Sequence, residues 1–96
     1  MLARKAGGMP SKIEVRDLGF RWGSSSERGI LFFNWKLTQL PIRLVDYVIL
    51  HELIHLIEPH HGTPFWERLE RALPDWRERK EEMHVSASKF VQFSLS

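Results

Sequence analysis

One stretch of sequence decides the fold: His51-Glu52-Leu53-Ile54-His55-Leu56-Ile57-Glu58-Pro59-His60-His61. His51 and His55 are four residues apart, so on a helix both imidazole rings project from one face and can reach a single metal ion. Glu52 stands beside them, where its carboxylate can take a proton from a metal-bound water without being a ligand itself. The pattern therefore predicts a metal centre built on a helix and on the turn that follows it.

A third metal ligand is expected just after this helix. Zinc at a catalytic site typically takes three protein ligands and leaves a fourth position to water. Two candidates are present, His60 and His61, and Pro59 before them ends the helix because it lacks a backbone donor and clashes with the preceding turn. The step from His55 to His61 matches the spacing H-E-x-x-H-x-x-G-x-x-H, although Glu58 stands at the glycine position. The spacing favours His61, with His60 as the alternative.

The helix that carries the motif is expected to be buried. The segment from Pro41 to Ile57 is apolar on nearly every side, which is typical of a helix in the middle of a domain. Burying His51, Glu52 and His55 there is costly unless they are paired or bound to a metal. Histidines that are merely hydrogen-bonded and inert are the alternative interpretation of such a motif. The apolar context favours the metal site, because a bound ion compensates all three groups.

Length and composition indicate one small domain with a single core. The chain has 96 residues, and 14 Lys and Arg face 12 Asp and Glu, an excess too small to imply binding to nucleic acid. It has no cysteine, which excludes disulfides and cysteine-ligated zinc. Neither a signal-peptide pattern nor an apolar run of about 20 residues is present. These features predict a soluble, cytoplasmic protein that does not bind a membrane.

The N-terminal part of the chain predicts a β-hairpin. Residues 1–11 are expected to form a flexible stub, and residues 12–96 a single domain. The segment 12–22 begins with alternating apolar and polar residues, which indicates a strand. A turn cluster over 23–29 leads to the segment 30–37, which is rich in β-branched and aromatic residues. Together these segments predict an antiparallel β-hairpin.

One or two further helices are expected after the histidines. The first begins near Thr63, a suitable N-cap, and has one apolar face. The second follows Asp75 and consists mostly of charged residues, which indicates a solvated face. For residues 86–96 the sequence favours neither a helical extension nor a strand. The fold class is therefore α+β, with the hairpin packed on the buried helix. The apolar face of the first of these helices comprises Phe65, Leu69 and Leu73.

Several other residues are candidates for supporting roles. Asp46 precedes His51 by five residues on the same helix and could accept a hydrogen bond from a ligand imidazole. A helix-surface carboxylate is the alternative interpretation. Arg21 could line a substrate groove. Trp22 and Trp35 are expected to fill the core between hairpin and helix.

Several short motifs in a fixed order make the sequence closely resemble the YgjP-like metallopeptidase domain family, relatives of the SprT-like zincins. The resemblance covers about residues 13–82. It implies a small zincin-like fold with one zinc ion per chain, held by His51, His55 and His61, and Glu52 as general base. It also favours His61 over His60 and implies a peptide or protein substrate. The motifs are Arg21-Trp22-Gly23-Ser24, Asn34-Trp35-Lys36-Leu37, Asp46-Tyr47-Val48, His51-Glu52-Leu53-Ile54-His55, His61 and Phe65-Trp66.

The sequence departs from this family pattern in two places. Ser25 stands where the family usually has a cysteine in the run Trp-Gly-Ser-Cys-Ser, so any role of that thiol is absent here. Family members also tend to have a longer N-terminal region. The chain is therefore expected to be either a minimal version or part of a larger protein.

The resulting hypothesis is a zinc metallopeptidase in which zinc polarises the carbonyl and Glu52 moves a proton from water to the leaving amine. The exposed strand of the hairpin could hold an extended peptide by strand addition. One alternative is a nucleotide pyrophosphohydrolase, with Arg16, Arg21 and Arg28 as phosphate contacts. Another is a non-catalytic zinc-containing module that binds nucleic acid or protein. The last fits less well, because structural zinc usually has four protein ligands.

Overall fold

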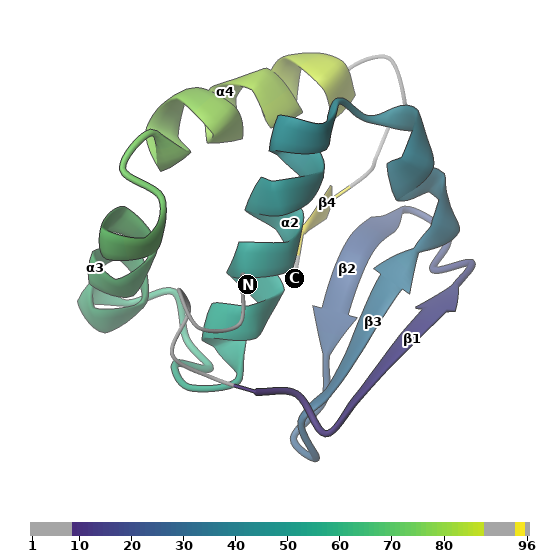
Figure 1. The fold of residues 1–96 in the computed structure, drawn as a ribbon, viewed down its shortest axis with the longest axis horizontal. Helices are drawn as coiled ribbons and strands as arrows, with labels where there is room; N and C mark the ends of the chain where they lie inside the picture. The colour runs from purple at the N-terminus through teal and green to yellow at the C-terminus, as the bar shows by residue number, and fades with distance from the viewer. Residues whose placement is uncertain (1–8, 88–93, 96) are drawn as a thin grey trace.

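The computed structural model describes residues 9–87 and 94–95. A central helix separates a small sheet from two further helices (Figure 1). This is the predicted α+β arrangement, with His51 and His55 on the central helix and two helices after it. The elements are β1 (Lys12–Arg16), β2 (Arg21–Ser25), β3 (Ile30–Asn34), the 3₁₀ helix η1 (Trp35–Gln39), α2 (Ile42–His55), α3 (Thr63–Ala72), α4 (Trp76–Ala87) and β4 (Ser94–Leu95).

The sheet contains the predicted hairpin but is larger than the hairpin alone. Its strand order is β1-β3-β2-β4. Strands β2 and β3 pair antiparallel, as predicted. Strand β1 pairs in parallel with β3, and β4 pairs in parallel with β2. The single strand predicted over residues 12–22 is thus wrong, because this segment forms two strands on opposite sides of β3.

A tight turn separates β1 from β2. Gly19 has a φ of 65°, in the left-handed region that favours glycine, and its N–H donates to Asp17 Oδ1 over 2.9 Å. The side-chain amide of Asn34, at the end of β3, donates to the carbonyl oxygens of Gly19 and Arg21 over 3.2 and 2.9 Å. These hydrogen bonds hold the turn against the end of β3. The chain therefore passes from one side of β3 to the other, and residues 12–25 form two strands instead of one.

Strand β3 ends at Asn34, earlier than the predicted end at Leu37. The side-chain oxygen of Asn34 accepts a hydrogen bond from the N–H of Lys36 at 3.1 Å and thereby begins helix η1. The change of direction leaves the Trp35 side chain 48% exposed, so its predicted place in the core is wrong. Trp22 is 1% exposed and lies in the core, as predicted.

Helix α2 is buried on most sides, as its apolar composition predicts. It follows Pro41, which is the N-cap rather than the first helical residue, and it ends at His55. After His55 the chain forms a tighter turn, in which the N–H of Ile57 donates to the carbonyl of Ile54, three residues earlier, over 2.9 Å. Its fully buried side chains form the centre of the core together with residues of β2, β3 and α3. These side chains include Leu44, Tyr47, Val48, Leu50 and Ile54 from α2, Trp22 and Leu31 from the sheet, and Phe65 and Leu69 from α3.

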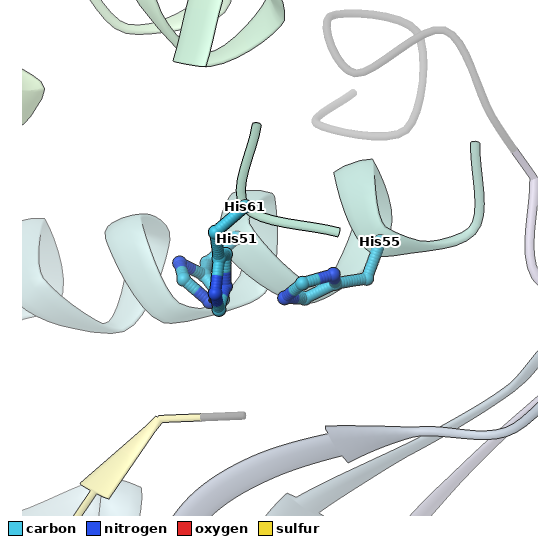
Figure 2. A group of neighbouring side chains, drawn as sticks. All are labelled: His51, His55 and His61. Atoms are coloured by element: carbon cyan, nitrogen blue, oxygen red, sulfur yellow. The ribbon is translucent and has the colours of Figure 1, made fainter. Parts of the chain in front are cut away.

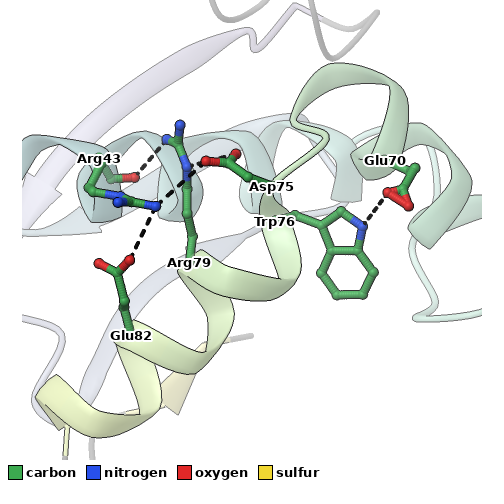
Figure 3. Close-up of polar contacts among 6 residues, drawn as sticks. All are labelled: Arg43, Glu70, Asp75, Trp76, Arg79 and Glu82. Atoms are coloured by element: carbon green, nitrogen blue, oxygen red, sulfur yellow. Dashed lines mark hydrogen bonds and ion pairs between the residues drawn. The ribbon is translucent and has the colours of Figure 1, made fainter.

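Charged side chains tie helix α4 to the start of α2 (Figure 3). Arg43 of α2 pairs with Asp75 at 3.5 Å and with Glu82 at 3.1 Å. Arg79 pairs with Asp75 at 3.0 Å and donates to the backbone oxygen of Arg43 over 3.0 Å. Such partly exposed pairs each contribute about 1 kcal/mol or less. The charged surface of α4, predicted to be a solvated face, therefore also orients this helix across α2.

Helix α3 begins one residue earlier than predicted. Gly62 is its N-cap, and Thr63 is its first residue. Pro64 lies in the first turn, where a missing backbone N–H costs nothing. Phe65 and Leu69 are fully buried against α2, as their spacing predicts.

The ends of the chain are described only in part. The predicted flexible stub, residues 1–11, lies mostly outside the described residues, and Ser11 at its end donates its N–H to the carbonyl of Gly29 over 2.9 Å. At the other end, α4 continues to Ala87 and β4 adds a short strand, so both alternatives considered for residues 86–96 occur. None of the described helices combines the length and the apolar character that crossing a bilayer requires.

Candidate metal centre

Three histidines converge at the C-terminal end of α2. His51 and His55 project from the helix, and His61 comes from the loop after it, so that the rings lie together (Figure 2). One ring nitrogen from each lies within 4.8 Å of the others. The Nε2 atoms of His51 and His61 are 3.2 Å apart. His60 is exposed and does not belong to this group in the described part of the chain.

The spacing of these nitrogens fits a shared metal ion. Two nitrogens bound tetrahedrally to zinc, each at about 2.0 to 2.1 Å, lie about 3.3 Å from each other. The 3.2 Å between the Nε2 atoms of His51 and His61 is close to that value. Imidazole ligands suit zinc, copper, nickel and iron. The three side chains could therefore hold a metal ion after only small movements.

The turn after α2 orients His55. Its Nδ1 lies 3.3 Å from the backbone oxygen of Glu58. Because a carbonyl oxygen only accepts hydrogen bonds, Nδ1 carries the proton of the neutral ring, and Nε2 keeps the lone pair that a metal needs. The Glu58 carboxylate in turn accepts a hydrogen bond from Arg68 Nε of α3 at 3.0 Å. Glu58, at the position where the related spacing has glycine, thus anchors this turn to α3.

Two aromatic residues of α3 hold the histidine rings in place. Phe65 is fully buried, and its ring centre lies 5.0, 4.7 and 4.9 Å from those of His51, His55 and His61. Trp66 donates its indole N–H to the backbone oxygen of His61 over 3.0 Å and stacks on that ring at 5.7 Å. The periodicity of the helix predicted only that Phe65 is apolar and buried. The motif Phe65-Trp66 was the one sequence signal for their place at the site.

Glu52 is fully buried and lies against strand β2 at Gly23. A Cβ atom added to Gly23 would lie 2.9 Å from Glu52 Cγ, which is closer than real Cβ atoms come to a neighbour, and a tight 3.2 Å from Glu52 Oε2. Glycine inside a strand often marks such a close approach. In the sequence, Gly23 stands within the motif Arg21-Trp22-Gly23-Ser24, which gives no sign of this role. Gly23 therefore makes room for the carboxylate of Glu52, the residue that directly follows His51.

Tyr47 packs one turn before the first histidine. It is 1% exposed, and its ring centre lies 6.0 Å from that of His51. Burial raises the pKa of Tyr47 to about 12. Its hydroxyl therefore stays neutral across the physiological range and adds no charge beside the histidines.

Two predicted supporting residues make no described contact with the histidines. Asp46 is half-buried on α2 and, being five residues from His51, lies roughly 140° around the helix from it. No hydrogen bond among the described residues links Asp46 to a histidine ring. Arg21 has an exposed side chain on β2. Among the proposed phosphate contacts, Arg16 pairs with Glu14 at 2.8 Å on β1. The roles of these residues remain predictions.

A buried helix with H-E-x-x-H, a third histidine after it and a small sheet beside it define a zincin-like metallopeptidase domain. The crystal structure of the metallopeptidase zymogen abylysin from Pyrococcus abyssi is similar in fold, with a TM-score of 0.80 and 21% sequence identity over 99% of this chain and 92% of that one. The family model for the YgjP-like metallopeptidase domain matches residues 1–86, so the chain belongs to this family. No curated protein matches the chain.

Family membership makes the chain a metallopeptidase, as the sequence predicted. A metallopeptidase acts on peptide or protein substrates and requires a metal ion. The group of three histidines is where the described residues could hold that ion.

Proposed function

We propose that the chain is a zinc-dependent peptidase in which His51, His55 and His61 hold one zinc ion and Glu52 is the general base. The convergence of three imidazole nitrogens within 4.8 Å carries this proposal. It is supported by the buried carboxylate of Glu52, the residue after His51, in a member of a metallopeptidase family. Three imidazole ligands are a donor set found in catalytic zinc sites.

Several residues of the chain each contribute one part of the proposed peptide hydrolysis. When bound, zinc polarises the scissile carbonyl and lowers the pKa of a water beside it. Glu52 accepts a proton from the attacking water and then donates it to the nitrogen of the leaving amine. Gly23 allows the Glu52 carboxylate to lie beside the histidines. The Glu58 carbonyl and Trp66 orient His55 and His61, so that little reorganisation accompanies the reaction.

Strand β2 is the element along which we propose that a peptide substrate lies. Extended peptides bind to sheet edges through backbone hydrogen bonds. The sequence suggested that the hairpin offers an open edge, but β4 pairs with β2, Arg21 with Ser94 and Gly23 with Leu95. Because Gly23 also contacts Glu52, β4 lies at the edge nearest the base. We propose that β4 keeps the enzyme latent, as the description of abylysin as a zymogen also suggests.

Neither alternative activity is favoured by a specific contact. Membership of a metallopeptidase family supports the peptidase over a nucleotide pyrophosphohydrolase and over a non-catalytic zinc module. The peptidase is therefore the single function that we propose.

Metal content tests the ligand assignment. We expect one zinc per chain by mass spectrometry of protein purified without a metal-affinity tag. His61→Ala should lose the zinc, whereas the matched variant His60→Ala should keep it. Loss of zinc in His60→Ala with retention in His61→Ala would overturn the assignment of the third ligand.

Hydrolysis tests the role of Glu52. Full-length protein and protein shortened before β4 are incubated with a mixed peptide library, and the products are identified by mass spectrometry. Glu52→Gln should keep its zinc and cleave peptides about 10² to 10⁴ times more slowly. Full activity of zinc-loaded Glu52→Gln would exclude Glu52 as the base. Equal activity of the two wild-type lengths would exclude latency through β4.

A further inference from the structure

A hollow of about 460 Å³ borders His55, between the β2–β3 turn and the end of α2. Its size falls within the range of about 300 to 1,000 Å³ that is usual for small-molecule sites. Two sides face each other across it. The turn contributes Ser25, Ser26 and Glu27, and the end of α2 contributes His55, Leu56 and Pro59. Because His55 belongs to the histidine group, the hollow opens directly next to the proposed site of reaction.

The hollow carries one negative charge. Glu27 is the one carboxylate in its wall, and Glu27 forms no ion pair among the residues that the structure describes. The neighbouring residue Arg28 does not line the hollow. Other carboxylates near the site are already engaged, since Glu58 pairs with Arg68 and Glu52 lies buried against Gly23. As far as residues 9–87 and 94–95 are concerned, the Glu27 carboxylate is therefore open to a cationic group of a ligand.

The rest of the wall suits the stem of a long cationic side chain. Leu56 and Pro59 offer apolar surface, against which the methylene groups of lysine or arginine can pack. Ser25, which stands where the family pattern has cysteine, adds a hydroxyl that can accept a hydrogen bond from an N–H group. The turn is held by Gly29, with a φ of 81°, and by the Ser26 hydroxyl, which accepts from the N–H of Ile30 over 3.2 Å. The wall is thus built before any ligand binds.

We propose that this hollow is a substrate pocket that takes a lysine or arginine side chain near the scissile bond, with Glu27 as its charge partner. A carboxylate recognises a guanidinium or ammonium group through charge-assisted hydrogen bonds. The proposal names the substrate class of the peptidase site and so rests on the proposed function.

The test compares peptides that differ in one residue. A series with Arg, Lys, Gln, Glu or norleucine next to the cleaved bond is hydrolysed by the zinc-loaded chain, both at full length and shortened before β4. We expect kcat/KM to be about fivefold higher for Arg and Lys than for norleucine, because a partly exposed ion pair is worth about 1 kcal/mol. Glu27→Gln should remove this preference, and Glu27→Lys should reverse it toward acidic side chains. Glu78→Gln, the same change at an exposed position of α4, should leave it unaltered.

Binding to an inactive variant separates this proposal from the peptidase activity itself. Fluorescence anisotropy with labelled Arg and norleucine peptides is measured on zinc-loaded Glu52→Gln, with and without Glu27→Gln. Tighter binding of the Arg peptide that is lost with Glu27→Gln supports the pocket, even if no peptide is cleaved by the wild type. Equal binding of both peptides, or a preference that survives Glu27→Gln, overturns the pocket whether or not peptides are cleaved.

Discussion

The two ends of helix α2 gather polar side chains in opposite ways. At its start, Arg43 and Arg79 meet Asp75 and Glu82, so that positive groups face negative groups (Figure 3). At its end, three histidines bring like nitrogen atoms together, two of them 3.2 Å apart (Figure 2). The first cluster neutralises itself across two helices. The second collects donors of one kind, which suits a positive ion supplied from outside.

The contrast shows how function differs from structural support within one small domain. Complementary charges that pair with one another stabilise the packing of α4. Nitrogen atoms that converge above the fully buried Phe65 gain most when an ion joins them. Variants at the two ends of α2 should therefore affect different properties of the protein.

The largest expected effect is on zinc affinity at the histidine end. His51→Ala removes one of three proposed ligands, and we expect affinity to fall by more than about 100-fold, beyond the 10 to 100-fold typical of groups that only orient ligands. Arg43→Ala removes two ion pairs and should leave zinc affinity unchanged while lowering the free energy of unfolding by about 2 kcal/mol or less. Competition titration with a zinc chelator and urea unfolding measure the two quantities. Equal losses of zinc affinity in both variants would remove the distinction between the two ends.

The next effect concerns the room that Gly23 leaves for Glu52. Gly23→Ala places a methyl group 2.9 Å from Glu52 Cγ, and the displaced carboxylate should lower kcat about 10 to 100-fold while zinc content stays at one per chain. Gly62→Ala is the matched control, because its nearest neighbour would be 3.7 Å away, an ordinary contact. Peptide hydrolysis and metal analysis are measured together. An unchanged kcat in Gly23→Ala would mean that Glu52 does not need this strand.

Two tryptophans allow a smaller, paired comparison. Trp66→Phe removes the hydrogen bond to the His61 carbonyl and should weaken zinc binding about tenfold. Trp76→Phe removes a similar bond, from the indole N–H to Glu70 at 3.1 Å, and should lower stability by about 1 kcal/mol without changing zinc affinity. Competition titration with a zinc chelator measures the zinc affinity of both variants. Similar zinc affinities for the two variants would count against an orienting role for Trp66.

Tyr47 should have the smallest effect, because it changes the stability of the protein only well above neutral pH. Its pKa is raised from 10.0 to about 12 by burial, so the unfolded chain ionises first as the pH rises. The stability that depends on the neutral phenol is complete well below pH 10 and should fall by about 1.4 kcal/mol by pH 11, since one pKa unit is worth about 1.4 kcal/mol. Tyr47→Phe should lack this fall. Parallel pH dependence of urea unfolding for both proteins would refute the shift.

Local patterns predicted the helical part of the molecule well. The apolar stretch before His51, the proline after it and the four-residue spacing all describe one helix, so α2 and its two histidines follow from nearby residues alone. The boundary of α3 was missed by one residue, because Gly62 and Thr63 are both good N-caps. Periodicity could not distinguish Trp35 from Trp22, because the bend that exposes Trp35 depends on the Asn34 side chain.

The pairing of strands that lie far apart in the chain could not be predicted from the sequence. Alternation identifies a strand but not its partner, so the parallel pairing of β1 with β3 and the addition of β4 could not be predicted. The contact between Gly23 and Glu52 likewise joins residues far apart in the chain. Spacing and family resemblance predicted that His61 lies with His51 and His55, whereas the place of Trp66 and the hollow beside His55 depend on how α3 and the turn pack.

The close approach of Gly23 to Glu52 also implies that metal binding and completion of the proposed active site are separate steps of folding. The proposed ligands lie on α2 and the loop after it, so a nascent or partly folded chain needs only this local segment to capture an ion. The space that Gly23 leaves for the Glu52 side chain forms only when the sheet packs on α2. A folding intermediate that binds its ion before the sheet packs on α2 should therefore be inactive as a peptidase.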